Sequence, residues 1–358
     1  MVTRLIYLEY GFWQAIIKDE SVQGKKIFWE IYSALELSDI CANIPNEIWE
    51  EDDNPLYYLI QNSADGYGTT IDMNNPERLK TALNKESKQT INNLCAIYLL
   101  DENSKKCEEY GHQLGILCLN ATTVRNRSSY VFGDAVDYKK GENCDGYSKC
   151  SEFLSPCNSL IIIDPYILKG NWNPRFTTKT NSIELNLIPL LQKIIPQQIE
   201  IPFHLSIFSQ AYGCVLDTNN NANGEEVFNY LDKKIHELWP NIIFSLYHIK
   251  TTGDGDGDFH SRHILTNNMA INAEDGFDLF KNKYFRKTNT NKCVCGKYAR
   301  IEFVHPTLSN NRRLETSCYI QWIKIASDNS VDATTKNPKK CWGWGRGTLE
   351  NRLFDLVK

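Results

Sequence analysis

Three apolar runs between residues 160 and 249 are separated by two amphipathic stretches, and this order most limits the fold classes that the chain can adopt. The runs cover 160–163, 199–208 and 242–249, and the stretches between them cover 182–196 and 225–239. Four consecutive branched apolar residues at 160–163 are typical of a strand buried on both faces. Strands that alternate with helices favour a sheet flanked by helices, so the sequence predicts an α/β domain here.

The first half shows a similar alternation. Residues 3–8 and 115–120 are expected to be strands, and 95–100 a strand or a buried helix. Helical spacing of apolar residues covers 27–37, and further helices are expected from 76 to 85 and from 90 to 93. We therefore expect a smaller α/β domain in this half.

The length of the chain, 358 residues, is typical of about two domains. Residues 121–158 mix charged residues with glycine and serine, and this composition favours a connector. We place the domain boundary near residue 150, which gives one α/β domain from 1 to 150 and a second from 151 to 358.

Composition and charge set the class of protein. The net charge is −5, so no overall basic character indicates a nucleic-acid partner, although local basic patches remain open. No run of 18 or more apolar residues is present, and Glu9 interrupts the first apolar run too early for a signal peptide. We expect a cytoplasmic protein with reduced thiols.

The twelve cysteines are scattered along the chain. Cys144, Cys150 and Cys157 lie close together, as do Cys293 and Cys295, but neither group has the doubled two-residue gap of a structural zinc site. Free thiols and a zinc site both remain open, and a set such as Cys295, Cys318 and Cys341 can meet only through the fold.

His260 and Arg262 are the residues with the clearest chemistry. Residues two apart on a strand share a face, so an imidazole and a guanidinium would lie side by side. Imidazole transfers protons or attacks phosphorus near neutral pH, and guanidinium grips phosphate oxygens with paired hydrogen bonds. Asn267 adds an amide to the same place if the strand turns back.

Asp164 follows the apolar run at 160–163, and Pro165 then stops ladder pairing. A carboxylate at this rim can orient His260, as an aspartate orients an imidazole in a catalytic triad. The alternative is that Asp164 and Pro165 only begin a turn.

This pattern resembles the phospholipase D motif, with Arg262 at its lysine position and Asn267 at its aspartate position. It is more similar to the phospholipase-D-like C-terminal domain of microtubule-interacting-and-trafficking (MIT) proteins. The motifs that carry this resemblance, over about residues 155–330, are Asp164-Pro165-Tyr166, His260-Ser261-Arg262, Asn267-Asn268 and Gly276-Phe277-Asp278-Leu279-Phe280. Ser261 departs from the family, which has an acidic residue there.

The resemblance implies a mixed sheet flanked by helices and a site that handles phosphodiesters without a metal cofactor. It implies that His260 is the nucleophile or general base and that Asp164 orients it. Arg262 would then clamp the phosphate, with Asn267 as a positioning amide and with Tyr166 and Asn268 as further phosphate contacts. A phospholipase-D-type site normally takes two motif copies and this chain has one, so a homodimer or another protein partner is expected. The alternative is that the N-terminal acidic residues carry a separate, metal-dependent cleavage.

Two functions follow from this resemblance. The first is a nuclease-related effector, or a subunit of a prokaryotic antiviral defence or toxin system, acting on nucleic acid. The alternative is a non-catalytic phosphate-binding module that docks on nucleic acid, anionic lipid or a protein partner. Arg262 favours the alternative, because arginine keeps phosphate affinity but does not readily give up a proton.

Acidic residues follow two apolar runs of the first half, Glu9 after the first run and Asp101 and Glu102 after the second. Strand ends converge at one edge of a parallel sheet, where carboxylates can hold Mg²⁺ or Mn²⁺. This arrangement resembles PIN-like ribonuclease domains, in which Glu9 would replace the usual aspartate. The alternative is that these carboxylates cap helices or face water.

Overall fold

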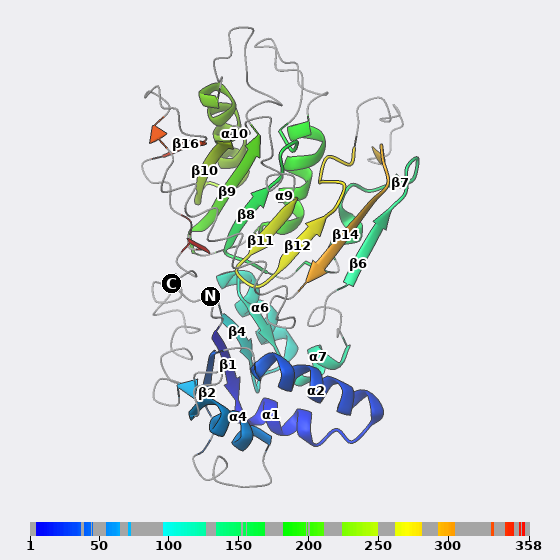
Figure 1. Cartoon of the computed structure of the whole chain (residues 1–358), viewed down its shortest axis with the longest axis vertical. Coiled ribbons are helices and arrows are strands. Elements are labelled where there is room, and N and C mark those ends of the chain that lie inside the picture. The colour runs from blue at the N-terminus through cyan, green and yellow to red at the C-terminus, as the bar shows by residue number, and fades with distance from the viewer. Residues whose placement is uncertain are drawn as a thin grey trace.

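The computed structural model describes residues 5–36, 39–43, 45, 55–64, 71–72, 96–126, 134–151, 153–154, 156–168, 182–197, 199, 201–210, 224–249, 262–280, 293–304, 331–332, 341–346, 351 and 353–354. Within these residues the strands form a five-stranded sheet, a nine-stranded sheet and a two-stranded ribbon. Figure 1 shows the two large sheets at opposite ends of the long axis, with α6 (Ser104–Leu114) between them. No helix among the described residues has the length and apolar character needed to cross a bilayer.

The first sheet is parallel, with the strand order β3-β2-β1-β4-β5. Its central strands confirm two of the expected runs, and Glu9 is the last residue of its strand. The strands are β1 (Leu5–Glu9), β2 (Asp39–Asn43), β3 (Ile71–Asp72), β4 (Ala96–Leu99) and β5 (Leu117–Leu119). The order reverses between β1 and β4, and ligands of open α/β sheets bind outside the strand ends at such a point.

Helices cover both faces of the first sheet, because successive apolar residues along its strands point to opposite faces. Ile6 and Leu8 of β1 pack with α1, α2 and α7, while Tyr7 packs on the opposite face with α6. The helices are α1 (Tyr10–Ile17), α2 (Val22–Glu36), α4 (Pro55–Ala64), α6 and α7 (Ala121–Asn126). The expected helices at 76–85 and 90–93 lie outside the described residues.

The second sheet is mixed, with the order β15-β16-β10-β9-β8-β11-β12-β14-β6. Its three parallel strands are β8 (Ser159–Ile163), β9 (Phe203–Gln210) and β10 (Ile242–Ile249), as the apolar runs predict. The remaining strands are β6 (Asp134–Tyr138), β11 (His263–Thr266), β12 (Ala270–Ala273), β14 (Ala299–Val304), β15 (Val331–Asp332) and β16 (Cys341–Gly345). The coarse expectation of a mixed sheet flanked by helices is therefore confirmed.

The expected amphipathic stretches form the helices on one face of this sheet. A π-helical turn, η3 (Ile183–Leu187), continues into α9 (Ile188–Ile194), and α10 (Gly224–Leu238) follows β9. Their apolar residues pack on alternate strand residues such as Leu160, Leu205 and Phe244. The packing of these helices on the strands positions the carboxyl end of β8, which Asp164 directly follows.

The described residues of the expected connector at 121–158 are instead folded, and the domain boundary near residue 150 stays a prediction. Strand β6 pairs with β14, and β7 (Asn143–Cys144) pairs with β13 (Cys293–Val294) in the two-stranded ribbon. A 3₁₀ turn, η2 (Ser148–Cys150), follows the ribbon. The chain therefore leaves the first sheet after α7 and has joined the second by β6. Glycine and charge marked surface turns here rather than a linker.

The two sheets are joined by a small set of buried contacts. Asn158 donates from Nδ2 to Leu114 O (3.1 Å), and Asn267 donates from Nδ2 to Gly115 O (3.0 Å). Gly115 ends α6 with φ of 59°, and a Cβ there would lie 2.4 Å from Cys157 O. Only glycine fits this close approach of two backbones.

Candidate functional site

The parallel strands of the second sheet bring three polar residues into one row at their carboxyl ends. Ser209 of β9 pairs in register with His248 of β10. Asp164 extends the ladder past β8 by donating its N–H to Phe208 O (3.1 Å), which places it level with Ser209. Neighbouring strands lie about 5 Å apart, so the three residues form a continuous row on the face that α9 and α10 cover.

Asp164 is fully buried, and each carboxylate oxygen accepts a backbone hydrogen bond. Tyr166 N donates to Oδ1 (2.7 Å) and Phe277 N donates to Oδ2 (2.9 Å). Burial raises the pKa of Asp164 above its ordinary value, and these two N–H groups and the nearby charge of Arg262 oppose that rise only in part.

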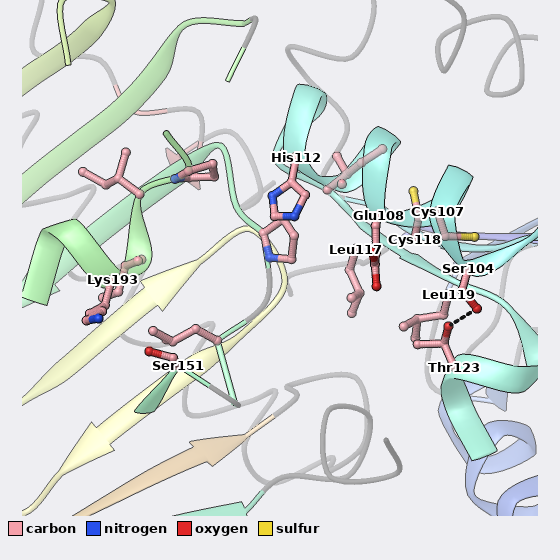
Figure 2. Close-up of a pocket in the computed structure, with 17 residues that line it drawn as sticks. Ser104, Cys107, Glu108, His112, Leu117, Cys118, Leu119, Thr123, Ser151 and Lys193 are labelled. Carbon is pink, nitrogen blue, oxygen red and sulfur yellow. Dashed lines mark hydrogen bonds between the residues drawn. The ribbon is translucent and has the colours of Figure 1, made fainter. Parts of the chain in front are cut away.

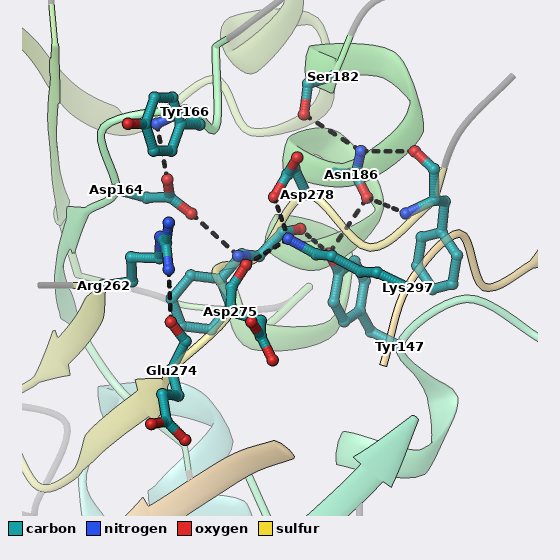
Figure 3. Close-up of polar contacts among 12 residues, drawn as sticks. Tyr147, Asp164, Tyr166, Ser182, Asn186, Arg262, Glu274, Asp275, Asp278 and Lys297 are labelled. Atoms are coloured by element: carbon teal, nitrogen blue, oxygen red, sulfur yellow. Dashed lines mark hydrogen bonds and ion pairs between the residues drawn. The ribbon is translucent and has the colours of Figure 1, made fainter. Parts of the chain in front are cut away.

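Arg262 lies beside Asp164, at the start of β11 (Figure 3). Its Cζ is 5.5 Å from the centre of the Tyr166 ring, a cation–π contact, and Nη1 donates to Glu274 O. Its Nε is buried and has no hydrogen-bond partner, and no carboxylate of the described residues forms an ion pair with it. The side chain is thus held in place while most of its five N–H donors remain unused.

The Gly-Phe-Asp-Leu-Phe segment is held by a set of polar contacts around this arginine (Figure 3). Asn186 bonds both backbone groups of Phe280, donating to O (3.0 Å) and accepting from N (2.8 Å). Lys297 pairs with Asp278, and the Tyr147 hydroxyl donates to Phe277 O. The segment therefore acts as a fixed support for Asp164 and Arg262.

Gly276 makes the approach of these groups possible. Its φ is 83°, and a Cβ there would lie 2.7 Å from Arg262 Cδ and 3.2 Å from Asp164 Oδ2. A side chain would be strained by this backbone and would push directly against the site.

Ser209, His248 and Trp344 were not predicted as site residues. Ser209 Oγ, both ring nitrogens of His248 and Trp344 Nε1 are buried without hydrogen-bond partners. The His248 and Trp344 rings lie 5.0 Å apart, and burial lowers the pKa of His248 to about 3. Buried polar atoms without partners are rare in native proteins and indicate water, an ion or a ligand. No sequence signal marks them, because the row exists only through strand register.

Several expected residues do not join Arg262. Asn267 and Asn268 follow the far end of β11, so the strand does turn, but away from Arg262. Both amides are buried and used in structural bonds: Asn267 Oδ1 accepts from Asn158 N (2.9 Å), and Asn268 Nδ2 donates to Pro156 O (2.7 Å). Both amides thus form structural bonds at the end of β11 opposite Arg262, and their contact with phosphate stays a prediction. His260 lies outside the described residues.

The first sheet brings two of its three predicted acidic residues together at the point where the strand order reverses. Glu9 ends β1, is largely buried and accepts the backbone N–H of Asp101 at Oε2 (2.7 Å). Glu102 instead pairs with Lys106 (2.6 Å), which is one helical turn further on. No group of three metal-ligating side chains occurs among the described residues.

A cavity of about 410 Å³ lies between α6, β5 and the end of α9 (Figure 2). Cys107, Cys118 and Leu119 line one side and Lys193 lines the other, and Pro156 is a further lining residue. It contains none of the predicted site residues, so this cavity and the candidate chemistry lie in different places. No family model matches this sequence, and the comparison with curated proteins found no similar sequence.

Proposed function

We propose that this protein binds the phosphate groups of a nucleic acid at the edge formed by Asp164, Tyr166 and Arg262. The observation that carries the proposal is the state of Arg262: it is oriented by Tyr166 and Glu274, lacks an ion-pair partner in the described chain and keeps unused donors. A preorganised guanidinium with free N–H groups fits the paired oxygens of a phosphate.

The geometry supports binding more strongly than hydrolysis. The phospholipase-D-like expectation assigns Asp164 to orient an imidazole, and the hydrogen bonds that its buried oxygens accept among the described residues come from the backbone N–H groups of Tyr166 and Phe277. A carboxylate used in this way shapes the backbone around it. We therefore rank the phosphate-binding module above the nuclease-related effector at this edge of the sheet.

Fluorescence anisotropy with labelled single-stranded and double-stranded DNA and RNA tests the proposal. Arg262→Ala should weaken binding about tenfold to a hundredfold, because a charged hydrogen-bonded contact contributes about 1.5–3 kcal/mol. Arg300→Ala is the matched control, since Arg300 is an exposed arginine that pairs with Glu302 and Asp137. Equal affinities of these two variants would refute the proposal.

The same reactions measure hydrolysis when the labelled strands are run on a denaturing gel. Cleavage that persists in EDTA and disappears in His260→Ala would move the function to phospholipase-D-type chemistry. Tight binding of intact strands by the wild-type protein supports the module.

A metal-dependent nuclease in the first sheet is a second candidate, favoured by the meeting of Glu9 and Asp101 where the strand order reverses. Glu9 accepts at Oε2 from the backbone N–H of Asp101 and at Oε1 from the Tyr7 hydroxyl (3.3 Å), and a Mg²⁺ or Mn²⁺ ion commonly takes one or two carboxylates with substrate phosphates and water. The metal would neutralise charge on a phosphodiester. Glu9 and Asp101 would hold it, as the PIN-like expectation requires.

Calorimetric titration of Mn²⁺ into the full chain tests this second site without relying on activity. Glu9→Gln should remove Mn²⁺ binding, and Glu102→Gln should keep it, because Glu102 is already paired with Lys106. Binding that survives Glu9→Gln, or is absent from the wild-type protein, contradicts the metal site.

A further inference from the structure

Two cysteines that are far apart in the sequence face each other in the small ribbon of β7 and β13. Cys144 and Cys293 are directly paired across antiparallel strands, and their Sγ atoms lie 3.8 Å apart. Residues paired in this way have Cα atoms about 4.5–5.5 Å apart, which lies within the range that a disulfide spans. The backbone is therefore already placed for an S–S bond.

The surroundings of the pair make one sulfur the better nucleophile. Cys293 Sγ accepts a hydrogen bond from Gly146 N (3.1 Å), and the Cys144 thiol lies in contact with it. These contacts lower the pKa of the Cys293 thiol, the Cys144 contact being the larger cause, and so favour its thiolate. By contrast, the burial of Cys157 raises the pKa of its thiol, and no thiol within the described ranges pairs with it.

We propose that Cys144 and Cys293 are a redox modification site, at which hydrogen peroxide converts the two thiols into a reversible disulfide. The proposal concerns the ribbon alone and does not depend on the phosphate site. Both thiols are largely buried, so a small oxidant suits the site better than a bulky disulfide such as oxidised glutathione.

The reaction balances as a two-electron oxidation. The Cys293 thiolate attacks one oxygen of hydrogen peroxide, the O–O bond breaks, and Cys293 sulfenic acid and hydroxide form. Cys144 sulfur then attacks the Cys293 sulfur, the S–O bond breaks, and the Cys144 proton leaves with the oxygen as water. Two thiols and one peroxide thus give one disulfide and two waters, and a dithiol reductant reverses the change.

The disulfide would link β7 covalently to β13, and the residues that follow β13 contact the 275–280 segment. Directly after the ribbon, Gly296 N donates to Leu279 O (2.8 Å), and Lys297 pairs with Asp278. Phe280 also forms an isolated bridge with Cys295. Oxidation therefore ties residue 144 to a strand that contacts the 275–280 segment, and the folded state should become more resistant to heat.

Peptide mapping of the full-length protein tests the proposal. The reduced protein is treated with hydrogen peroxide, its remaining thiols are alkylated, and it is digested and analysed by mass spectrometry without reduction. The expected product is a cross-linked peptide pair containing Cys144 and Cys293, short by two hydrogen atoms and absent after dithiothreitol. The melting temperature should rise by roughly 5 °C on oxidation, because the bond closes a long loop.

Three variants make the result decisive. Cys144→Ser and Cys293→Ser should each abolish the cross-linked pair and the rise in melting temperature, while Cys157→Ser keeps both. Circular dichroism of each reduced variant establishes that it is folded. A cross-link to Cys295 in place of Cys144, or full alkylation of both thiols after peroxide, overturns the proposal. Stoichiometric zinc that the reduced wild-type protein holds and Cys144→Ser loses would overturn it as well.

Discussion

Replacing Gly276 by alanine should damage both folding and phosphate binding, and Gly141 offers a matched control. The two glycines have nearly the same φ, 83° and 84°. A Cβ on Gly276 would lie 2.7 Å from Arg262 Cδ, whereas a Cβ on Gly141 would meet nothing within 4 Å. The pair therefore separates backbone strain from contact with the site.

The magnitudes follow from these two terms. A residue other than glycine in this left-handed region costs about 1–2 kcal/mol, and alanine's smaller unfolded-state entropy offsets about 0.4–1 kcal/mol. Gly141→Ala should therefore lose about 1 kcal/mol. Gly276→Ala adds the cost of displacing packed atoms, about 1–3 kcal/mol, and should lose about 2–4 kcal/mol in total.

The Gly276→Ala and Gly141→Ala variants should differ more in oligonucleotide affinity than in the free energy of unfolding. In Gly276→Ala the Arg262 side chain must move off the Tyr166 ring, so oligonucleotide affinity should fall about tenfold or more. Gly141→Ala should bind as the wild-type protein does. Urea unfolding followed by circular dichroism measures the first effect, and fluorescence anisotropy measures the second. Wild-type affinity in a folded Gly276→Ala variant would refute the assignment of Arg262 to the site.

Three further outcomes are expected. Tyr166→Leu should weaken oligonucleotide binding about threefold to tenfold by removing the cation–π contact that orients Arg262, as anisotropy would measure. Asn267→Ala should lower the free energy of unfolding by about 2–4 kcal/mol in urea titrations, because it breaks two buried bonds, yet leave binding unchanged. Burial lowers the pKa of His248 from 6.5 to about 3. Between these two pH values the unfolded state therefore binds a proton at His248 that the folded state does not bind. Stability should drop as pH falls through this window, by on the order of 4 kcal/mol, and thermal unfolding of His248→Phe should show a smaller drop.

The sequence predicts the strands and helices best where their patterns are strong. The four branched apolar residues of β8 are fully buried. A run of this length favours a strand, because helices are longer. Strand β6 was missed because an edge strand needs only one apolar face: Val136 and Tyr138 are buried while Asp137 is exposed. That two-residue period is short and lies among charged and glycine residues, where turns are the usual interpretation.

The composition of the site was harder to predict, since it depends on pairing between distant strands. Asp164 and Arg262 were predicted together, and the structure brings them together because β8 and β11 are neighbours. Ser209 and His248 join the row only through the register of β9 and β10, which no local pattern specifies. Asn267 was expected at the site from its spacing and from the phospholipase D resemblance, and the pairing of β11 with β12 turns the chain away from Arg262.

The motifs that suggested chemistry also form a structural lock, by which we mean a set of hydrogen bonds and one ion pair that join their segments. Asp164 holds Phe277, Asn186 holds Phe280, and Lys297 holds Asp278, so the Asp-Pro-Tyr and Gly-Phe-Asp-Leu-Phe segments stabilise each other. A carboxylate in such a lock has little freedom to reorient during a reaction, and Arg262 is the member whose polar groups stay unused. The same lock therefore favours recognition of a phosphate over its transfer, because recognition needs only a fixed cation.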